Sequence, residues 1–185
     1  MLHLVLSLAL SLAPTLPSNS AEVEVHVGHD DASAPAATTP DDEKRAGLAQ
    51  YNVSKKGLAL DGYDPVAYFP DYGGKATKGS DKITATHAGI TYQFATEANK
   101  ATFLKSPAAF EPQFGGWCAW AMADGKGDKV DVDPKSFTVE DGKLYVFYDG
   151  FFGDTRKSWN KGGGAPKLAA NAAKNWGRYL APPKK

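Results

Sequence analysis

The residues best suited to chemistry lie together in the stretch 113–122, which reads Gln-Phe-Gly-Gly-Trp-Cys-Ala-Trp-Ala-Met. It contains the only cysteine of the chain, Cys118, directly after a glycine pair and a tryptophan. Two glycines allow a tight turn, and a thiol at the start of a following helix would lie near the positive helix end, which favours the thiolate. Cys118 is therefore the first candidate for a reactive or ligating centre. The alternative is an inert thiol packed among aromatic side chains, because free cysteine is among the most buried residue types.

A soft-metal site is one kind of chemistry that this sulfur could support. If residues 116–124 form a helix, Cys118 and Met122 lie four positions apart on one face, and a thiolate with a thioether suits Cu(I). His87, on a predicted strand, would add an imidazole if the fold brings it close. The predicted metal ligands are therefore Cys118, Met122 and His87, with copper or another soft ion as the cofactor. The alternative places Met122 in the core and His87 on a strand surface.

Aromatic residues could line a small-molecule pocket beside the cysteine, with a nearby acidic residue as the polar group. The predicted ligand-binding residues are Tyr63, Asp64, Tyr92, Trp117 and Trp120, with Tyr68 as a further aromatic. The alternative for the aromatic residues is the core of a small domain, where large rings usually pack. The alternative for Asp64 is a cap, because it precedes Pro65 at what would be the first position of a short helix.

Composition restricts the class of protein. The chain has 185 residues, 42% of them hydrophobic, which is enough for one substantial core and one domain. A net charge of zero provides no general attraction for nucleic acid or for an anionic membrane, which leaves only local charged patches, so we expect a metal ion or a small molecule as the partner. With a single cysteine, no intramolecular disulfide can form. We find no catalytic triad, phosphate loop or zinc-protease motif, which favours a binding role over a catalytic one.

The N-terminus resembles an export signal. Residues 2–13 are almost continuously apolar, prolines follow, and small residues precede Ala21, so we expect a signal peptide over 1–20. The apolar run is too short for a permanent membrane anchor. Residues 21–50 are rich in Ala, Pro, Thr, Ser and acidic residues, which predicts a flexible linker. The expected location is secreted or periplasmic.

The rest of the chain predicts an α+β fold over 51–181, followed by a tail at 182–185. Two pairs of apolar segments flank Ala88-Gly89 and Asp141-Gly142 and predict two β-hairpins, expected to join in one small antiparallel sheet. Several helices should pack on this sheet. They are expected from Pro65 to about 69, over 97–105 with Thr96 as the N-cap, over 107–110, over 151–161, and from Pro166 to about 180.

Four motifs in this order resemble the YHS domain family: residues 62–69 (Gly-Tyr-Asp-Pro-Val-Ala-Tyr-Phe), 89–96, 115–119 (Gly-Gly-Trp-Cys-Ala) and 141–145. They look most like its exported branch, in which the position of Cys118 is cysteine or, in some members, selenocysteine. The resemblance covers about residues 52–180 and implies a small α+β domain often associated with heavy metals, particularly copper. Metal-handling members carry cysteines at three positions where this chain has Ala67, Ala95 and Asn99. The family's usual thiolate ligands are therefore missing here.

Three hypotheses of function follow. The first is an exported YHS-type binding module that takes a soft metal ion or a small ligand at a site centred on Cys118. The second is a single-thiol redox protein in which Cys118 is oxidised. The third is a structural or interaction domain without chemistry, in which Cys118 only packs. We rank the binding module first.

Overall fold

The structure is a computed structural model, and it describes residues 37–38, 45 and 47–182. Every described residue belongs to one compact unit, Ser33–Lys185. The predicted signal peptide and most of the predicted linker lie outside the described residues. Among the helices of the described ranges, none combines the length and the apolar character needed to cross a bilayer.

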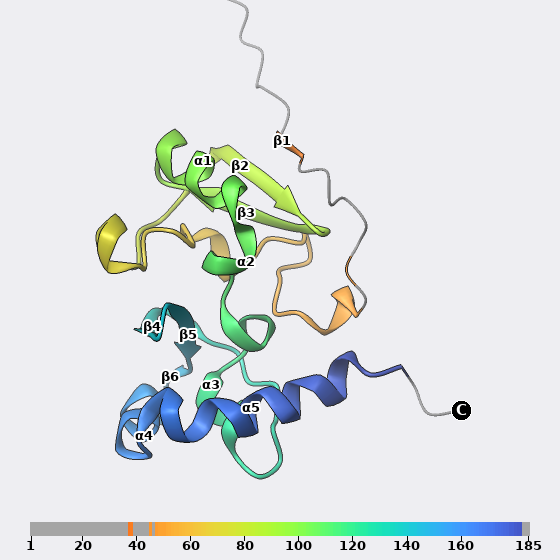
Figure 1. Cartoon of the computed structure of the whole chain (residues 1–185), viewed down its shortest axis with the longest axis vertical. Coiled ribbons are helices and arrows are strands. Elements are labelled where there is room, and N and C mark those ends of the chain that lie inside the picture. The colour runs from red at the N-terminus through yellow and green to blue at the C-terminus, as the bar shows by residue number, and fades with distance from the viewer. Residues whose placement is uncertain (1–36, 39–44, 46, 183–185) are drawn as a thin grey trace, which may run out of the picture. The chain divides into compact units, whose positions relative to one another are not determined.

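The described fold is α+β, as predicted (Figure 1). The strands are β1 (Ala37–Thr38), β2 (Ser80–His87), β3 (Ile90–Phe94), β4 (Asp133–Glu140), β5 (Lys143–Phe147), β6 (Asp149–Gly150) and β7 (Gly153–Asp154). The α-helices are α1 (Glu97–Lys105), α2 (Pro107–Phe110), α3 (Ala119–Ala123), α4 (Arg156–Lys161) and α5 (Gly164–Leu180). Short turns of 3₁₀ type are η1 (Leu48–Gln50), η2 (Leu60–Gly62), η3 (Pro70–Tyr72) and η4 (Gln113–Gly116).

Both predicted hairpins are confirmed. β2 pairs with β3 through a turn at Ala88-Gly89, and β4 pairs with β5 through a turn at Asp141-Gly142. All four turn residues have positive φ, from 47° at Ala88 to 84° at Gly89. Two consecutive left-handed residues match the right-handed twist of the strands, which is why these dipeptides signal hairpins so strongly.

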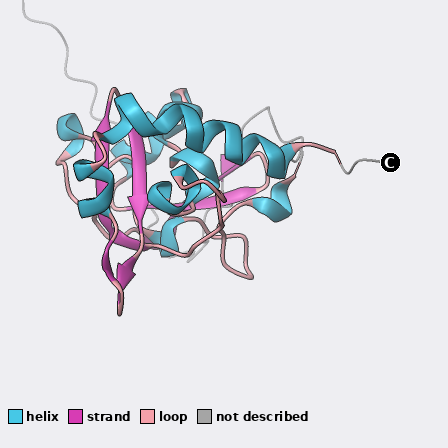
Figure 2. Cartoon of the chain, turned by 90° about the horizontal axis from the view of Figure 1, so that it is seen from below, coloured by secondary structure: helices cyan, strands magenta, loops and turns pink. Residues whose placement is uncertain are grey.

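The prediction that the hairpins join in one sheet is wrong. β1, β2 and β3 form one sheet, while β4–β5 and β6–β7 are separate pairs. In Figure 2 the magenta strands lie in more than one group and not in a single sheet. The reason lies in β5. Its Leu144 and Val146 pack in one hydrophobic core, and the alternate residues Tyr145 and Phe147 pack in a second core. Because both faces of β5 are buried, its hairpin lies between two cores instead of extending the first sheet.

The first core lies between β2–β3 and the helices α1 and α2, and its centre is Phe103, whose ring lies 4.7 Å from that of Tyr92 between centroids. The second core contains α3, α4 and α5, with the buried Trp159 packed on Tyr145 and Phe147. Figure 1 shows the elements of the first core above those of the second. The candidate residues of the sequence are therefore distributed over two cores.

The helix predictions are confirmed in part. α1 has the predicted bounds, and the Thr96 hydroxyl accepts the Asn99 N–H at 3.1 Å. α5 begins two residues before Pro166. The helix predicted over 151–161 is only Arg156–Lys161, because the preceding residues form the β6–β7 hairpin. The helix predicted from Pro65 is wrong, since residues 65–68 form turns.

Part of the predicted linker packs on the domain. Ala37 and Thr38 pair in parallel with Ala85 and Thr86 of β2, and the Arg45 N–H donates to the carbonyl of Ala88 at 3.3 Å. The described residues before position 51 therefore belong to the fold rather than to a free spacer.

Candidate functional site

Cys118 is fully buried. Its side chain has 0% exposure, and it lies immediately before α3, not inside the helix as predicted. The sulfur lies 3.3 Å from the Thr155 hydroxyl oxygen, and that hydroxyl donates to the carbonyl of Tyr148 at 3.0 Å. The Thr155 oxygen is therefore left to accept a hydrogen bond from the Cys118 thiol. The contact between Cys118 and Thr155 therefore contributes packing and a hydrogen bond at the second core.

The three predicted metal ligands are not brought together. Met122 is buried in the same core as Cys118, and its N–H donates to the Cys118 carbonyl at 2.9 Å. His87 lies on β2, where its ring is 6.4 Å from Phe103 of the first core. In the described part of the chain, no three His, Cys, Asp or Glu residues form a group that could hold a metal ion. Two soft ligands fall short of the usual three or four, so these residues do not fit a copper centre.

Asp64 is a structural cap. Its Oδ1 accepts the N–H groups of Val66 and Ala67 at 2.9 and 3.3 Å, and its Oδ2 accepts the Ala95 N–H at 2.8 Å and the Asn99 side-chain amide at 2.7 Å. These four bonds use the four acceptor positions of a carboxylate. The buried Asp64 therefore has no acceptor left for a ligand. Three of its four partners, Ala67, Ala95 and Asn99, occupy the positions where the resemblance implies cysteines. These positions therefore meet at Asp64, but none of them supplies a thiol.

The two tryptophans near Cys118 face different surroundings. The Trp117 indole donates to the carbonyl of Gln50 at 2.6 Å, and the Lys129 ammonium lies 5.4 Å from its ring centroid. Trp120 packs near Gly162, where a Cβ added to the glycine would lie 3.4 Å from the ring. Each ring therefore serves a separate contact, and neither forms a pocket with the sulfur.

The two predicted tyrosines also lie apart from Cys118. The Lys78 ammonium lies 4.7 Å above the ring of Tyr63. The buried Tyr92 donates to Glu111 Oε1 at 2.7 Å. Burial, and then the neighbouring Glu111 charge, raise the pKa of Tyr92 well above its ordinary value. The structure does not bring the predicted ligand-binding residues into one site.

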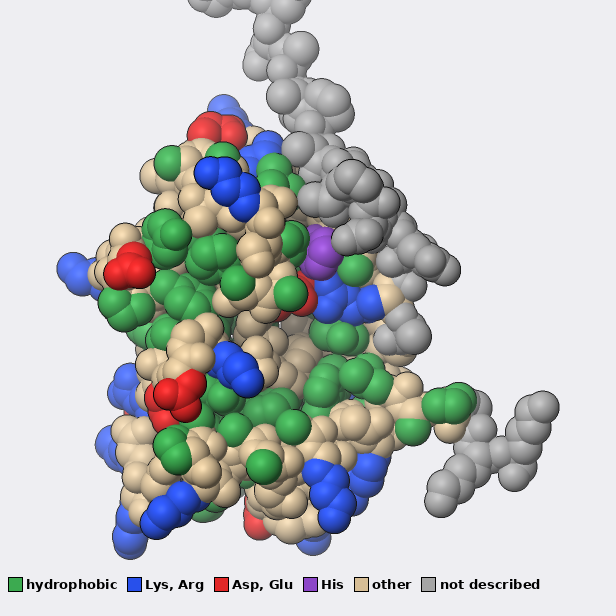
Figure 3. All heavy atoms as spheres, viewed as in Figure 1, with side chains coloured by type: hydrophobic (Ala, Val, Ile, Leu, Met, Phe, Trp, Pro, Cys, Tyr) green, Lys and Arg blue, Asp and Glu red, His purple; other side chains and the backbone are tan. Residues whose placement is uncertain are grey.

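Glu111 is neutralised by a residue from the N-terminal segment. Arg45 forms a two-pronged ion pair with it, at 3.0 Å from Nη1 and 2.5 Å from Nη2, and the guanidinium lies 4.9 Å from the Tyr51 ring centroid. Both residues border a cavity of about 220 Å³ that is also lined by Trp176. Figure 3 shows a hollow between the elements of the first and second cores on this face. Arg45 already pairs with the carboxylate, and the polar side-chain atom that stays buried without a hydrogen-bond partner among the described residues is the Nε of Arg45 itself.

The glycine pair docks other parts of the chain. Gly115 and Gly116 have φ of +63° and +83°, and they follow Phe114 at +55°. A Cβ on Gly115 would lie 2.6 Å from the Trp176 ring, so only glycine allows α5 to approach this closely. Asn52 donates its N–H to the Gly115 carbonyl at 2.8 Å and its side-chain amide to the Gly116 carbonyl at 3.1 Å. The motif that drew attention to the thiol therefore serves packing.

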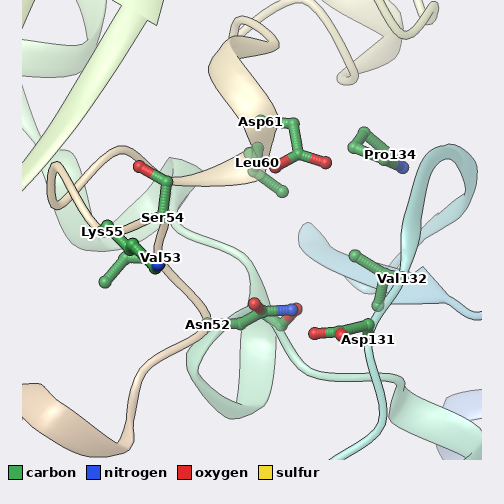
Figure 4. Close-up of a pocket in the computed structure, with 10 residues that line it drawn as sticks. Asn52, Val53, Ser54, Lys55, Leu60, Asp61, Asp131, Val132 and Pro134 are labelled. Atoms are coloured by element: carbon green, nitrogen blue, oxygen red, sulfur yellow. The ribbon is translucent and has the colours of Figure 1, made fainter.

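Gly116 borders a larger cavity of about 440 Å³ (Figure 4). Its wall includes four apolar side chains and five polar ones from three parts of the sequence. The apolar residues are Val53, Leu60, Val132 and Pro134, and the polar residues are Asn52, Ser54, Lys55, Asp61 and Asp131. Cys118 does not line it. The cavity has the size of a small-molecule site, and its lining is more polar than the walls of most such sites.

One strained backbone segment, at Leu60 and Asp61, lines this cavity. Leu60, Asp61 and Gly62 have φ of 52°, 48° and 79°, a second left-handed run like that of 114–116. A non-glycine residue held in this conformation costs about 1–3 kcal/mol, and such strain is concentrated at binding and active sites. Leu60, Asp61 and Gly116 all line the cavity. The backbone strain therefore occurs at the same cavity as the polar side chains.

Two carboxylates at the cavity are unpaired. Within the described ranges, the side chains of Asp61 and Asp131 make no hydrogen bond or ion pair, and Lys78 contacts Asp61 only through its backbone carbonyl. Figure 4 shows the two carboxylates on opposite sides of the cavity, with that of Asp131 directed toward Asn52. Lys55 is the one cation in the lining, so the carboxylates are in excess.

Sequence reasoning missed this cavity. Asp61 was part of a turn-forming pair with Gly62, and Asp131 ended a glycine-rich loop. Nothing in either local pattern relates one to the other, because the two are distant in the sequence and only the fold brings them to one cavity.

No protein-family model, no curated protein and no solved structure matches this chain.

Proposed function

We propose that this chain is an exported binding module of the YHS type that holds a small organic cation in the cavity between η2 and Gly116. One observation carries the proposal: two unpaired carboxylates, Asp61 and Asp131, line a single cavity of about 440 Å³. The ligand-binding role is the one expected from the sequence, but the site is this cavity and not the sulfur of Cys118.

The chemistry of the lining favours an amine. A charged hydrogen bond between an ammonium and a carboxylate contributes about twice as much as a neutral one. The apolar residues Val53, Leu60 and Val132 would contact the carbon skeleton of the ligand. An anionic ligand would meet two carboxylates and only one lysine, Lys55, so the charge selects against it.

The resemblance to YHS domains contributes the class and the expected export. The α+β fold and the convergence of positions 67, 95 and 99 on Asp64 both support it. Copper chemistry is not carried over, because alanines and an asparagine occupy those positions. The redox alternative gains no support either, since a redox thiol must meet its oxidant and Cys118 is fully buried.

Thermal shift and isothermal titration of the chain without residues 1–20 test the proposal. These residues lie outside the unit Ser33–Lys185, which contains every described residue, so their removal deletes none of the described fold. Putrescine and choline are the cationic probes, with succinate and glycerol as anionic and neutral controls. A probe at 100 times its Kd stabilises by about 2.7 kcal/mol, which corresponds to a rise of about 5–10 °C in Tm.

Charge-neutral variants then locate the site. Asp61→Asn and Asp131→Asn should each weaken cation binding by about tenfold, since each removes one charged hydrogen bond. Asp141→Asn is the matched control, because Asp141, like Asp61, is an exposed aspartate with positive φ, and it lies away from the cavity at the tip of the β4–β5 hairpin. The proposal fails if neither cation binds, or if all three variants behave alike.

A further inference from the structure

The β6–β7 hairpin presents two phenylalanines to solvent. Phe151 and Phe152 form its two-residue loop and are 95% and 88% exposed. The only other large hydrophobic side chain exposed in the described residues is Tyr72, at 42%. The two rings contact each other edge to face, with 5.2 Å between centroids. Almost all of their surface is therefore available to a partner.

Contacts of the residues next to the loop hold the tip of the β6–β7 hairpin in place. The Tyr148 ring packs against Gly150, where a Cβ would lie 2.6 Å from its hydroxyl, and the same hydroxyl accepts the Phe152 N–H at 3.4 Å. Asp154, at the end of the hairpin, accepts the Ser136 hydroxyl at 2.7 Å and the Arg156 N–H at 2.9 Å. These contacts fix the direction in which the phenylalanines project.

Stability does not account for phenylalanine at these positions. Loop positions in hairpins favour Gly, Asn and Asp, and aromatic rings in water contribute no burial to the fold. Exposed aromatic side chains in adjacent positions are a mark of an interaction site. Phe151 and Phe152 are thus explained by a partner and not by packing.

The size and shape of the patch restrict that partner. Two phenylalanine side chains offer about 300–500 Å², whereas a stable protein interface needs roughly 800 Å² from each side. The patch lies at the tip of a hairpin, between Gly150 and Gly153, which add no apolar margin. A second copy meeting it tip to tip would fall short of a stable dimer. A bilayer needs no matching surface and accepts a projecting apolar tip.

Unpaired basic residues outnumber unpaired acidic ones near the tip, because Asp149 of β6 is the one exposed acidic residue of the hairpin and the Asp154 carboxylate is paired with Arg156. α4 follows the hairpin directly and carries Lys157 and Lys161, both exposed and without an ion pair among the described residues. Figure 3 shows lysine and arginine side chains along the lower left of the view, where Figure 1 places α4. Aromatic residues at the interface with basic residues beside them are typical of reversible membrane binding.

We propose that Phe151 and Phe152 insert into the interfacial layer of an anionic phospholipid bilayer, with Lys157 and Lys161 near its headgroups. This contact is reversible and peripheral, because two rings and two lysines provide far less affinity than a spanning helix. It is independent of the cation site, which involves other residues.

Co-sedimentation of the chain without residues 1–20 with large unilamellar vesicles tests this proposal. We expect binding to vesicles of phosphatidylcholine with phosphatidylglycerol, and at least tenfold weaker binding to phosphatidylcholine alone. The double variant Phe151→Ser and Phe152→Ser should lose at least tenfold in affinity while its Tm stays within a few degrees of the wild type. Tyr72→Ser, which removes the other exposed aromatic side chain, should bind as the wild type does.

Three results would overturn the proposal. One is wild-type protein that stays in the supernatant with anionic vesicles. Another is a double variant that binds as well as the wild type. The third is a concentration-dependent dimer, seen by sedimentation equilibrium, that the double variant abolishes, because the tip would then bind a second copy. Lys157→Gln with Lys161→Gln should remove the preference for phosphatidylglycerol, and an unchanged preference would refute the role of the lysines.

Discussion

Glu140, the last residue of β4, forms hydrogen bonds with residues of β4, α4 and α5. Its replacement therefore tests the contacts that hold these elements together. Its Oε1 accepts the Thr138 hydroxyl and the Trp159 indole, each at 2.8 Å, and its Oε2 accepts the Ala165 N–H at 2.7 Å in the first turn of α5. Gly164 allows this approach, since a Cβ there would lie 2.5 Å from Oε2. The carboxylate thus caps a seventeen-residue helix with negative charge at its positive end.

Glu140→Gln should destabilise the protein by about 1–4 kcal/mol. Whichever way the amide is turned, its NH₂ faces at least one donor, and leaving a buried donor such as the Trp159 indole or the Ala165 N–H unpaired costs about 1–3 kcal/mol. Loss of the charge at the helix end adds about 0.3–1 kcal/mol. For a domain of this size the sum corresponds to a fall of roughly 5–15 °C in Tm.

The same contacts predict a pH dependence. Burial by itself raises the pKa of Glu140, but the hydrogen bonds from Ala165, Trp159 and Thr138 outweigh burial and hold the pKa below its ordinary value of 4.5. A lowered folded-state pKa means that the stabilisation is fully present above pH 4.5 and is lost as the pH falls through the folded value. The stability difference between wild type and Glu140→Gln should therefore be constant near neutral pH and shrink on acidification.

Urea unfolding followed by tryptophan fluorescence, repeated at several pH values, measures both effects. Glu97→Gln is the control, because Glu97 is an exposed glutamate in the first turn of α1 and should change stability by about 0.5 kcal/mol or less. The reasoning is refuted if Glu140→Gln matches Glu97→Gln at neutral pH, or if its deficit stays constant into acid.

Two further predictions concern residues singled out by the sequence. The Cys118 thiol, with 0% exposure, should react with Ellman's reagent only after denaturation, and rapid labelling of the native chain would restore the redox hypothesis. Asp64→Asn should lower the free energy of unfolding, measured in urea, by about 3 kcal/mol or more. The reason is that an amide cannot accept all four hydrogen bonds from Val66, Ala67, Ala95 and Asn99. A variant that keeps full stability but loses ligand binding would instead assign Asp64 to a binding site.

Local signals in the sequence were sufficient for several elements. The hairpin turns at Ala88-Gly89 and Asp141-Gly142 and the N-cap of α1 at Thr96 were all predicted. In each case the determining hydrogen bonds join residues a few positions apart, so neighbouring residue types decide the geometry. The α+β class followed from these elements alone.

Long-range contacts overruled local patterns elsewhere. The apolar pattern of 151–161 favoured one helix. In the structure the Asp154 carboxylate accepts hydrogen bonds from Ser136 of β4 and from the N–H of Arg156, so residues 149–154 form a hairpin and α4 begins only at Arg156. β5 looked like one strand of a single sheet, yet both of its faces are buried in different cores. A short segment of sequence includes neither the hydrogen-bond partner of Asp154 nor the residues of the second core, so its local pattern cannot predict either outcome.

By itself the sequence determined the hairpins, the capped helix and the presence of a single thiol, because these depend on residue type and on neighbours along the chain. Only the tertiary structure decided that Cys118 is buried and that Asp61 and Asp131 share a cavity with their carboxylates unpaired. The physical reason is that burial and pairing depend on which distant segments pack together. A residue type indicates what chemistry is available, and packing decides whether a ligand can reach it.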